Sequence, residues 1–151
     1  MAHSYDPKFM AYADRSSRHS ARRVGKLLLA ALPVRSVLDI GCARGTWLEA
    51  WKELGVDAIQ GVDGDYIQPA ELVIPRANFR AFDLSQPLEL GRRFELVQSL
   101  EVAEHISAAA AATFVENLTR HSEGLVLFSA APPGQGGEFH VNEQPYQYWR
   151  A

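Results

Sequence analysis

The sequence predicts an α/β fold in which helices cover a mostly parallel sheet, and three observations support this prediction. From residue 36 onward, short apolar runs alternate with stretches of helical periodicity, which is the pattern of stacked βα units. A turn with two glycines joins the first apolar run to the stretch that follows it. Acidic residues stand near the ends of the first three expected strands, at Asp39, Asp63 and Asp83. Because open parallel sheets bind ligands outside the carboxyl ends of their strands, a ligand site is expected there.

The chain is expected to form a single domain, since 151 residues with 47% apolar content can bury one core. We divide it into an N-terminal helical cap, residues 1–33, and an α/β core, residues 34–151. A helix is predicted over Ser16–Leu32, where apolar residues recur at helical spacing and Pro33 stops them. Its first half is basic. A solvated helix face and a phosphate-binding stripe both explain this charge, and we favour the solvated face.

The remaining elements follow from the same periodicities. The expected strands are Ser36–Ile40, Ala58–Val62, Asn78–Phe82, Phe94–Leu100 and Leu125–Ser129. The expected helices are Thr46–Leu54 and Ala108–His121. Residues 132–137 read Pro-Pro-Gly-Gln-Gly-Gly, which predicts a mobile loop of the kind that often covers a ligand. Residues 142–150 can open a further helix.

Composition excludes several classes of protein. The formal net charge of -3 gives no overall positive field, so nucleic acid is an unlikely partner. The single cysteine, Cys42, cannot form an intramolecular disulfide, which fits a reducing cytoplasm. The apolar run Leu27–Leu32 is too short to span a membrane and too far from the N-terminus for a signal peptide. We therefore expect a cytoplasmic protein with no membrane partner.

The most informative stretch is residues 37–46, Val-Leu-Asp-Ile-Gly-Cys-Ala-Arg-Gly-Thr, where a strand passes through two glycines into a helix. Gly41 and Gly45 let the backbone pass close to a ligand, and the new helix presents free N–H groups. A nucleotide-like cofactor fits such a turn. The Gly-x-Gly-x-x-Gly spacing of dinucleotide enzymes is missing, so an NAD-linked oxidoreductase is disfavoured.

This turn resembles the first motif of class I S-adenosylmethionine (SAM) dependent methyltransferases, Asp-x-Gly-x-Gly-x-Gly, with Ala43 in the place of the middle glycine. The resemblance implies that the turn holds the amino acid end of SAM, that Asp63 binds the ribose and that Asp83 accepts the adenine amino group. Asp65 in place of Asp63, and a turn-capping role for Asp83, stay open. The implied cofactor contacts are Asp39, Gly41, Cys42, Ala43, Gly45, Asp63, Gly64, Asp83, Leu84, Leu100 and Glu101.

A second motif follows the fourth expected strand. Residues 101–105 read Glu-Val-Ala-Glu-His and resemble the Glu-x-x-Glu-His segment found at the reaction centre of many small-molecule methyltransferases. His105 is the first candidate for the catalytic base, because an imidazole exchanges protons near neutral pH. Glu104 is its alternative or its orienting partner.

The same residues resemble those of metal-dependent methyltransferases that act on the 2'-hydroxyl of RNA ends. With a later histidine, the set that would hold a divalent metal is Glu101, Glu104, His105 and His140. Relatives without a metal also carry Glu-His at this place. We therefore do not favour a metal.

The resemblance implies a three-layer, Rossmann-like sandwich with strand order 3-2-1-4-5, in which the family's sixth and seventh strands are apparently missing. The sequence stops inside an expected helix, so we favour a C-terminally truncated chain, whose fifth strand is an exposed edge that could mediate self-association. The expected function is transfer of a methyl group from SAM to oxygen, nitrogen or carbon of a small molecule. The alternatives are a non-catalytic or partner-completed SAM-binding module, and a metal-dependent RNA-end 2'-O-methyltransferase. The activity of this short chain alone stays open.

Overall fold

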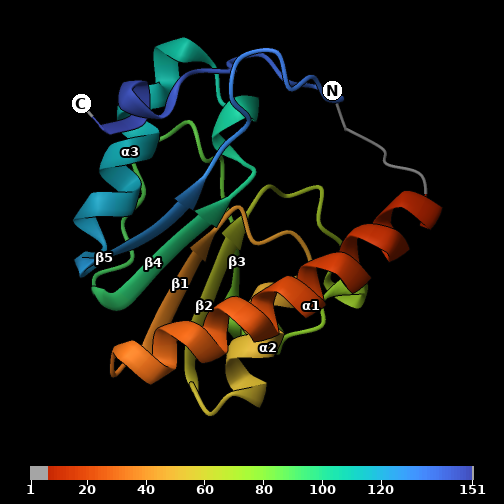
Figure 1. Ribbon diagram of the computed structural model, residues 1–151, viewed down its shortest axis with the longest axis vertical. Helices are drawn as coiled ribbons and strands as arrows, with labels where there is room; N and C mark the ends of the chain where they lie inside the picture. Colours follow the sequence, from red (N-terminus) through yellow and green to blue (C-terminus); the bar gives the residue numbers. More distant parts are fainter. Residues whose placement is uncertain (1–6, 151) are drawn as a thin grey trace.

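The computed structural model describes residues 7–150, with side chains described from Ser16 onward. Its core is a five-stranded parallel sheet in the order β3-β2-β1-β4-β5 (Figure 1). The strands are β1 Ser36–Ile40, β2 Ala58–Asp63, β3 Phe79–Ala81, β4 Phe94–Leu100 and β5 Ser122–Ser129. The predicted number, direction and order of the strands are confirmed.

Three α-helices and several short 3-10 helices connect the strands. The α-helices are α1 Pro7–Ala31, α2 Thr46–Glu53 and α3 Ala111–Arg120. The 3-10 helices are η1 Pro69–Glu71, η2 Arg76–Asn78, η3 Ala103–His105, η4 Ala108–Ala110 and η5 Tyr146–Arg150. Residues 132–137 form neither helix nor strand, as predicted.

Two helix starts differ from the prediction. Helix α1 begins at Pro7, well before Ser16, because proline is favoured in the first helical turn and the residues after it are good helix formers. The prediction relied on apolar residues later in this helix, although Phe9, Tyr12 and Ala13 already recur at helical spacing. At the other boundary, Ala108–Ala110 form a tighter 3-10 turn before α3, whose start has no side-chain cap.

The helices cover both faces of the sheet, which gives three layers (Figure 1). Alternation along β1 directs Leu38 toward a core cluster that contains Phe114 of α3. It directs Val37 toward the opposite cluster, which contains Trp51 of α2. Only 1% of Trp51 is exposed. The three-layer architecture is therefore confirmed.

Helix α1 lies along α2 and pairs its basic residues with acidic ones. Arg18 Nη1 lies 2.6 Å from Glu49 Oε2, and Arg22 Nε lies 2.7 Å from Glu53 Oε2. Both pairs lie at the surface, and Arg22, Arg23 and Lys26 are exposed, which agrees with the solvated face favoured for this helix.

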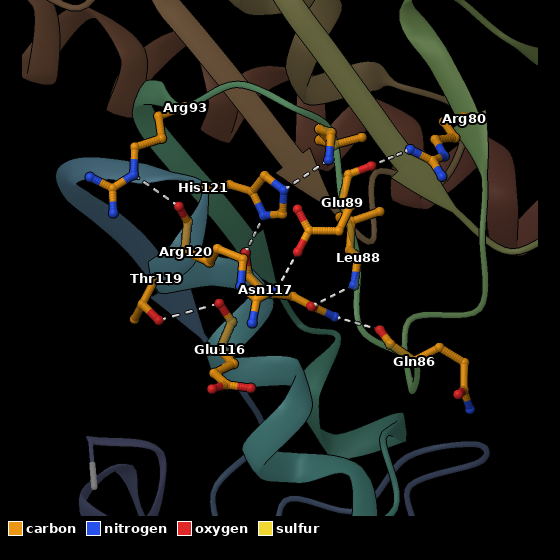
Figure 2. A network of polar contacts seen from close by, with 11 residues as sticks. Arg80, Gln86, Leu88, Glu89, Arg93, Glu116, Asn117, Thr119, Arg120 and His121 are labelled. Atoms are coloured by element: carbon orange, nitrogen blue, oxygen red, sulfur yellow. Dashed lines mark hydrogen bonds and ion pairs between the residues drawn. The ribbon is translucent and has the colours of Figure 1, made fainter.

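A polar network fastens the loop before β4 to α3 (Figure 2). The buried Asn117 side chain accepts a hydrogen bond from Leu88 N at 2.8 Å and donates one to Gln86 O at 2.8 Å. The Nδ1 atom of buried His121 lies 2.8 Å from Asn117 O, and Nε2 accepts a hydrogen bond from Leu90 N at 3.2 Å. This network fixes the course of the chain that leaves β3 and Asp83.

Strand β5 lies at the edge of the sheet, as predicted. Helix η5 packs beside it, with the ring centroids of Trp149 and Phe128 5.9 Å apart. A cavity of about 390 Å³ opens between α3, β5 and η5. Self-association through this edge stays a prediction. None of the described helices is long and apolar enough to cross a membrane.

Candidate active site at the carboxyl edge of the sheet

The sheet brings the predicted site residues to one edge. Because all neighbouring strands are parallel, the segments that follow β1, β2, β3 and β4 leave the sheet on the same side. These four segments, with the last residues of the strands before them, carry all the residues that the sequence implied as cofactor contacts. The cavity beside β5 is lined by other residues and is not part of this site.

The turn between β1 and α2 requires its glycines. Gly41 and Gly45 have φ angles of 89° and 90°, in the region that side chains rarely adopt. A Cβ atom on Gly41 would lie 2.3 Å from Val102 Cγ2, and one on Gly45 would lie 2.8 Å from Ile74 Cγ1. Ala43 also has a positive φ of 46°, which the family's usual glycine would adopt at lower cost. The turn is thus packed closely between two apolar side chains.

Asp63 ends β2 beside this turn and is the most highly connected acid of the site. Its carboxylate accepts hydrogen bonds from Ala43 N at 2.6 Å, Gly64 N at 2.7 Å and the Tyr66 hydroxyl at 2.5 Å. Burial raises the pKa of Asp63, while these hydrogen bonds and the nearby His105 lower it. Asp65, the other candidate, is exposed, so the structure favours Asp63 as the acid that faces the turn.

Asp39 and Cys42 lie beneath the turn. Burial raises the pKa of Asp39 to about 7, an interaction with Gln98 opposes this rise, and the charge of Asp63 adds to it. Cys42 is 6% exposed, and a Cβ atom added to Gly61 would lie only 2.7 Å from its Sγ atom. These two side chains therefore support the turn from within the core.

Asp83 follows β3 and is exposed. Its Oδ1 atom accepts hydrogen bonds from Ser85 N at 2.9 Å and Ser85 Oγ at 2.6 Å, which lower its pKa. The turn-capping role left open for Asp83 is therefore present. Leu84, beside it, is buried in the core, and Leu100 is half-buried at the end of β4.

Glu104, His105 and His140 form a compact cluster beyond β4. One ligand atom from each of the three lies within 4.8 Å of the others. Glu104 is 1% exposed, and neither carboxylate oxygen has a hydrogen-bond partner among the described residues. Burial raises the pKa of Glu104. A buried carboxylate without partners favours the approach of a proton donor or a cation.

The contacts of His105 indicate which of its two ring nitrogens carries the proton. His105 Nδ1 lies 3.2 Å from Phe139 O, and the two histidine rings meet edge to face with centroids 5.0 Å apart. A carbonyl oxygen only accepts hydrogen bonds, so the neutral His105 ring carries its proton on Nδ1. Its Nε2 atom is then free to accept a proton.

Glu101 is separated from this cluster. Its backbone has a φ of 57°, and its carboxylate accepts a hydrogen bond from Ser129 Oγ at 2.7 Å. The structure therefore assembles three of the four residues considered for a metal. Glu104, His105 and His140 have the donor atoms to hold a divalent cation, whereas Glu101 lies outside this group.

Sequence reasoning missed four residues that shape the site. Val102 and Ile74 pack against the glycines, Tyr66 binds Asp63, and Glu143 contacts His140. Two of them had a signal, because Tyr66 follows Asp63 within the same turn and Val102 lies inside the Glu-Val-Ala-Glu-His motif. Ile74 and Glu143 come from segments whose positions depend on tertiary packing.

The fold and the turn after β1 define a Rossmann-like protein of the class I methyltransferase type. A family model described as a methyltransferase domain matches residues 12–150. The chain therefore belongs to the methyltransferase domain family. The narrower Glu-x-x-Glu-His subgroup stays a prediction.

Solved structures with the same fold include three informative examples. DesVI from Streptomyces venezuelae has a TM-score of 0.69 and 22% identity, over 90% of this chain and 62% of that one. CalS10 from Micromonospora echinaspora, an amino pentose methyltransferase with SAM bound, has a TM-score of 0.65 and 23% identity, over 91% and 62%. Magnesium protoporphyrin IX methyltransferase from Synechocystis, with bound S-adenosylhomocysteine (SAH), has a TM-score of 0.65 and 21% identity, over 97% and 76%.

The chain spans 62% of the length of the first two of these structures. No curated protein sequence matches it.

Proposed function

We propose that the chain binds SAM at the carboxyl edge of its sheet and serves in methyl transfer to a small-molecule acceptor. The observation that carries this proposal is the position of Asp63, a buried carboxylate at the end of β2 that is hydrogen-bonded to the glycine-containing turn after β1. A carboxylate there can accept hydrogen bonds from both hydroxyls of a ribose. The solved structures with bound SAM or SAH share this fold, which supports the same cofactor here.

The residues of the edge fit the parts of SAM. Gly41, Ala43 and Gly45 would hold its amino acid end, at the turn of positive φ angles from which α2 begins. Asp63 would bind the ribose. Asp83 would accept the adenine amino group through Oδ2, because Ser85 occupies its Oδ1 atom. When bound, SAM supplies an electrophilic methyl group.

In this proposal the chain's own residues orient the acceptor and remove its proton. His105 is the proposed base, because its Nε2 atom is available to accept a proton. It also lies close enough to Asp63, the proposed ribose-binding acid, to lower the pKa of that carboxyl group. Glu104 lies beside it as a buried carboxylate with a raised pKa, and it would stabilise the protonated imidazole. Oxygen, nitrogen and carbon acceptors are all compatible with this arrangement.

Small molecules are favoured over RNA for three reasons. The comparison structures include an amino pentose methyltransferase and a sugar N-methyltransferase. In this chain, two of the basic residues of α1 that would have to contact RNA are paired with acids of α2. The alternative of a metal-dependent RNA-end methyltransferase also needs Glu101 as a metal ligand, and Glu101 lies outside the cluster of Glu104, His105 and His140.

The experiment that tests the function is transfer of a labelled methyl group from SAM to a panel of amino sugars and hydroxylated sugars. We expect transfer to fall by about a hundredfold or more in His105→Asn, with SAH affinity unchanged. Binding of SAH without transfer to any acceptor would favour the alternative of a SAM-binding module. Loss of transfer on chelation, with restoration by manganese, would favour the metal-dependent alternative.

A further inference from the structure

Glu143 is the centre of a hydrogen-bonded unit that the proposed reaction does not yet use. Its carboxylate accepts hydrogen bonds from Gly134 N and Gly136 N, each at 2.8 Å. Its Oε1 atom also lies 2.7 Å from His140 Nδ1. One side chain therefore holds both the glycine loop and the histidine of the Glu104 cluster.

The loop packs directly on the ring of His140. A Cβ atom on Gly137 would lie 2.3 Å from His140 Nε2, so any other residue there would cover this nitrogen. Gly134 and Gly136 have φ angles of 85° and 70°, which turn their N–H groups toward Glu143. The loop was predicted to be mobile, and the structure instead shows it fastened at two backbone positions.

The contact with Glu143 decides which nitrogen of His140 carries the proton. An ionised carboxylate only accepts hydrogen bonds, so Nδ1 of the neutral ring must be the donor. Nε2 then presents a lone pair to the cluster, where Glu104 Oε1 lies 4.0 Å away. The charged and titratable groups around the ring are Glu143 on its own segment, and Glu104 and His105 on η3.

Glu104 would favour the opposite arrangement. Its buried oxygens have no partner among the described residues, so a proton on Nε2 of His140 would be drawn to them. Two carboxylates thus compete for one imidazole proton. Glu143 is within hydrogen-bond distance of the ring and Glu104 is not, which decides the competition in favour of Glu143.

We propose that Glu143 is a positioning residue that fixes the tautomer of His140, so that its Nε2 atom accepts a hydrogen bond from the N–H or O–H group of the methyl acceptor. This inference rests on the proposed methyl transfer. His140 then serves beside His105 in orienting the acceptor, and the loop 134–137 holds the ring in place. Glu143 would thus belong to the site although it lies outside the glycine-containing turn of residues 37–46 and outside the segment 101–105.

The test is to assign the tautomer of His140 by long-range ¹⁵N–¹H correlation spectra of the full chain, at a pH where the ring is neutral. We expect the Nδ1-protonated form in the wild type and in Glu143→Gln, which keeps an acceptor oxygen. We expect the Nε2-protonated form in Glu143→Leu. Glu138→Leu, an exposed position in the same loop, is the matched control and should leave the spectrum of His140 unchanged.

Methyl transfer and SAH binding are then measured on the same proteins. We expect Glu143→Leu to lower the transfer rate by about tenfold or more without changing SAH affinity, and Glu143→Gln to retain most of the rate. An Nε2-protonated ring in the wild type, or an unchanged tautomer or rate in Glu143→Leu, would overturn the inference. If Glu143→Leu does not fold, the wild-type tautomer and the rate of Glu143→Gln decide. Failure of the wild type to bind SAH would instead count against the proposed function, because the tautomer is read without cofactor.

Discussion

The Asp63 carboxylate accepts a hydrogen bond of 2.6 Å from the backbone N–H of Ala43. This contact joins the end of β2 to the turn after β1, so two neighbouring strand ends form one structural unit. Ala43 is held with a positive φ, and its N–H group is directed at an acid that is 4% exposed. The geometry of the turn and the position of the acid are therefore coupled.

The tight packing of this turn predicts a large cost for Gly41→Ala. The variant must adopt a φ of 89° and place a Cβ atom 2.3 Å from Val102 Cγ2. Gly55→Ala is the matched control, because its φ is 93° and nothing lies within 4 Å of the added atom. We expect about 1–2 kcal/mol of destabilisation in the control and about 1–3 kcal/mol more in Gly41→Ala. Urea unfolding measures both, and equal losses would show that the contact with Val102 relaxes freely.

The buried Asp39 predicts a pH-dependent stability. Its pKa in the folded chain is about 7, above that of an exposed aspartate, so folding favours its protonated form. The stability that protonated Asp39 contributes to the folded chain is fully present below the pKa of the unfolded chain, and it is lost as pH rises to about 7. Asp39→Asn removes this titration. We therefore expect the free energy of unfolding of the wild type, relative to that of the variant, to decrease as pH rises from about 4 to about 7. Urea titrations across this range measure it. A constant difference would show that the pKa of Asp39 is the same in the folded and unfolded chains.

The network in Figure 2 predicts that Asn117 is required for stability. Asn117→Ala leaves Leu88 N and Gln86 O without their partner in a buried region, at a cost of about 2–4 kcal/mol. Glu116→Ala, one residue earlier and exposed, should change stability by about 0.5 kcal/mol or less. Thermal unfolding of both variants checks this. Similar melting temperatures for both would contradict the structural role of the network.

The hydroxyl of Tyr66 predicts competition with the cofactor. It donates a hydrogen bond to Asp63 Oδ1, an oxygen that a ribose hydroxyl would use in the proposed complex. Tyr66→Phe removes this competitor, and we expect SAH to bind about tenfold more tightly. Calorimetric titration of the variant and the wild type measures the change. Weaker binding by the variant would mean that the hydroxyl contacts the cofactor itself.

The sheet could be predicted because its strands are short apolar runs between turn residues. Asp39, Asp63 and Asp83 stand near the carboxyl ends of three of these strands. The start of α1 was missed because the prediction relied on apolar residues later in the helix and passed over Phe9, Tyr12 and Ala13, which have the same spacing. Within the site, Asp63 was found from its place after a strand. Glu143 was missed because its role depends on a loop that folds back onto His140, and no periodic pattern marks such a contact.

The central claim is that Asp63 is the cofactor-binding acid of a SAM site. Calorimetric titration with SAH tests it most directly, on the wild type, on Asp63→Ala and on Asp65→Ala as the exposed control. We predict binding by the wild type and by Asp65→Ala, and no detectable binding by Asp63→Ala while circular dichroism shows that it is folded. Equal binding by Asp63→Ala and the wild type, or loss of binding in Asp65→Ala alone, would contradict the claim.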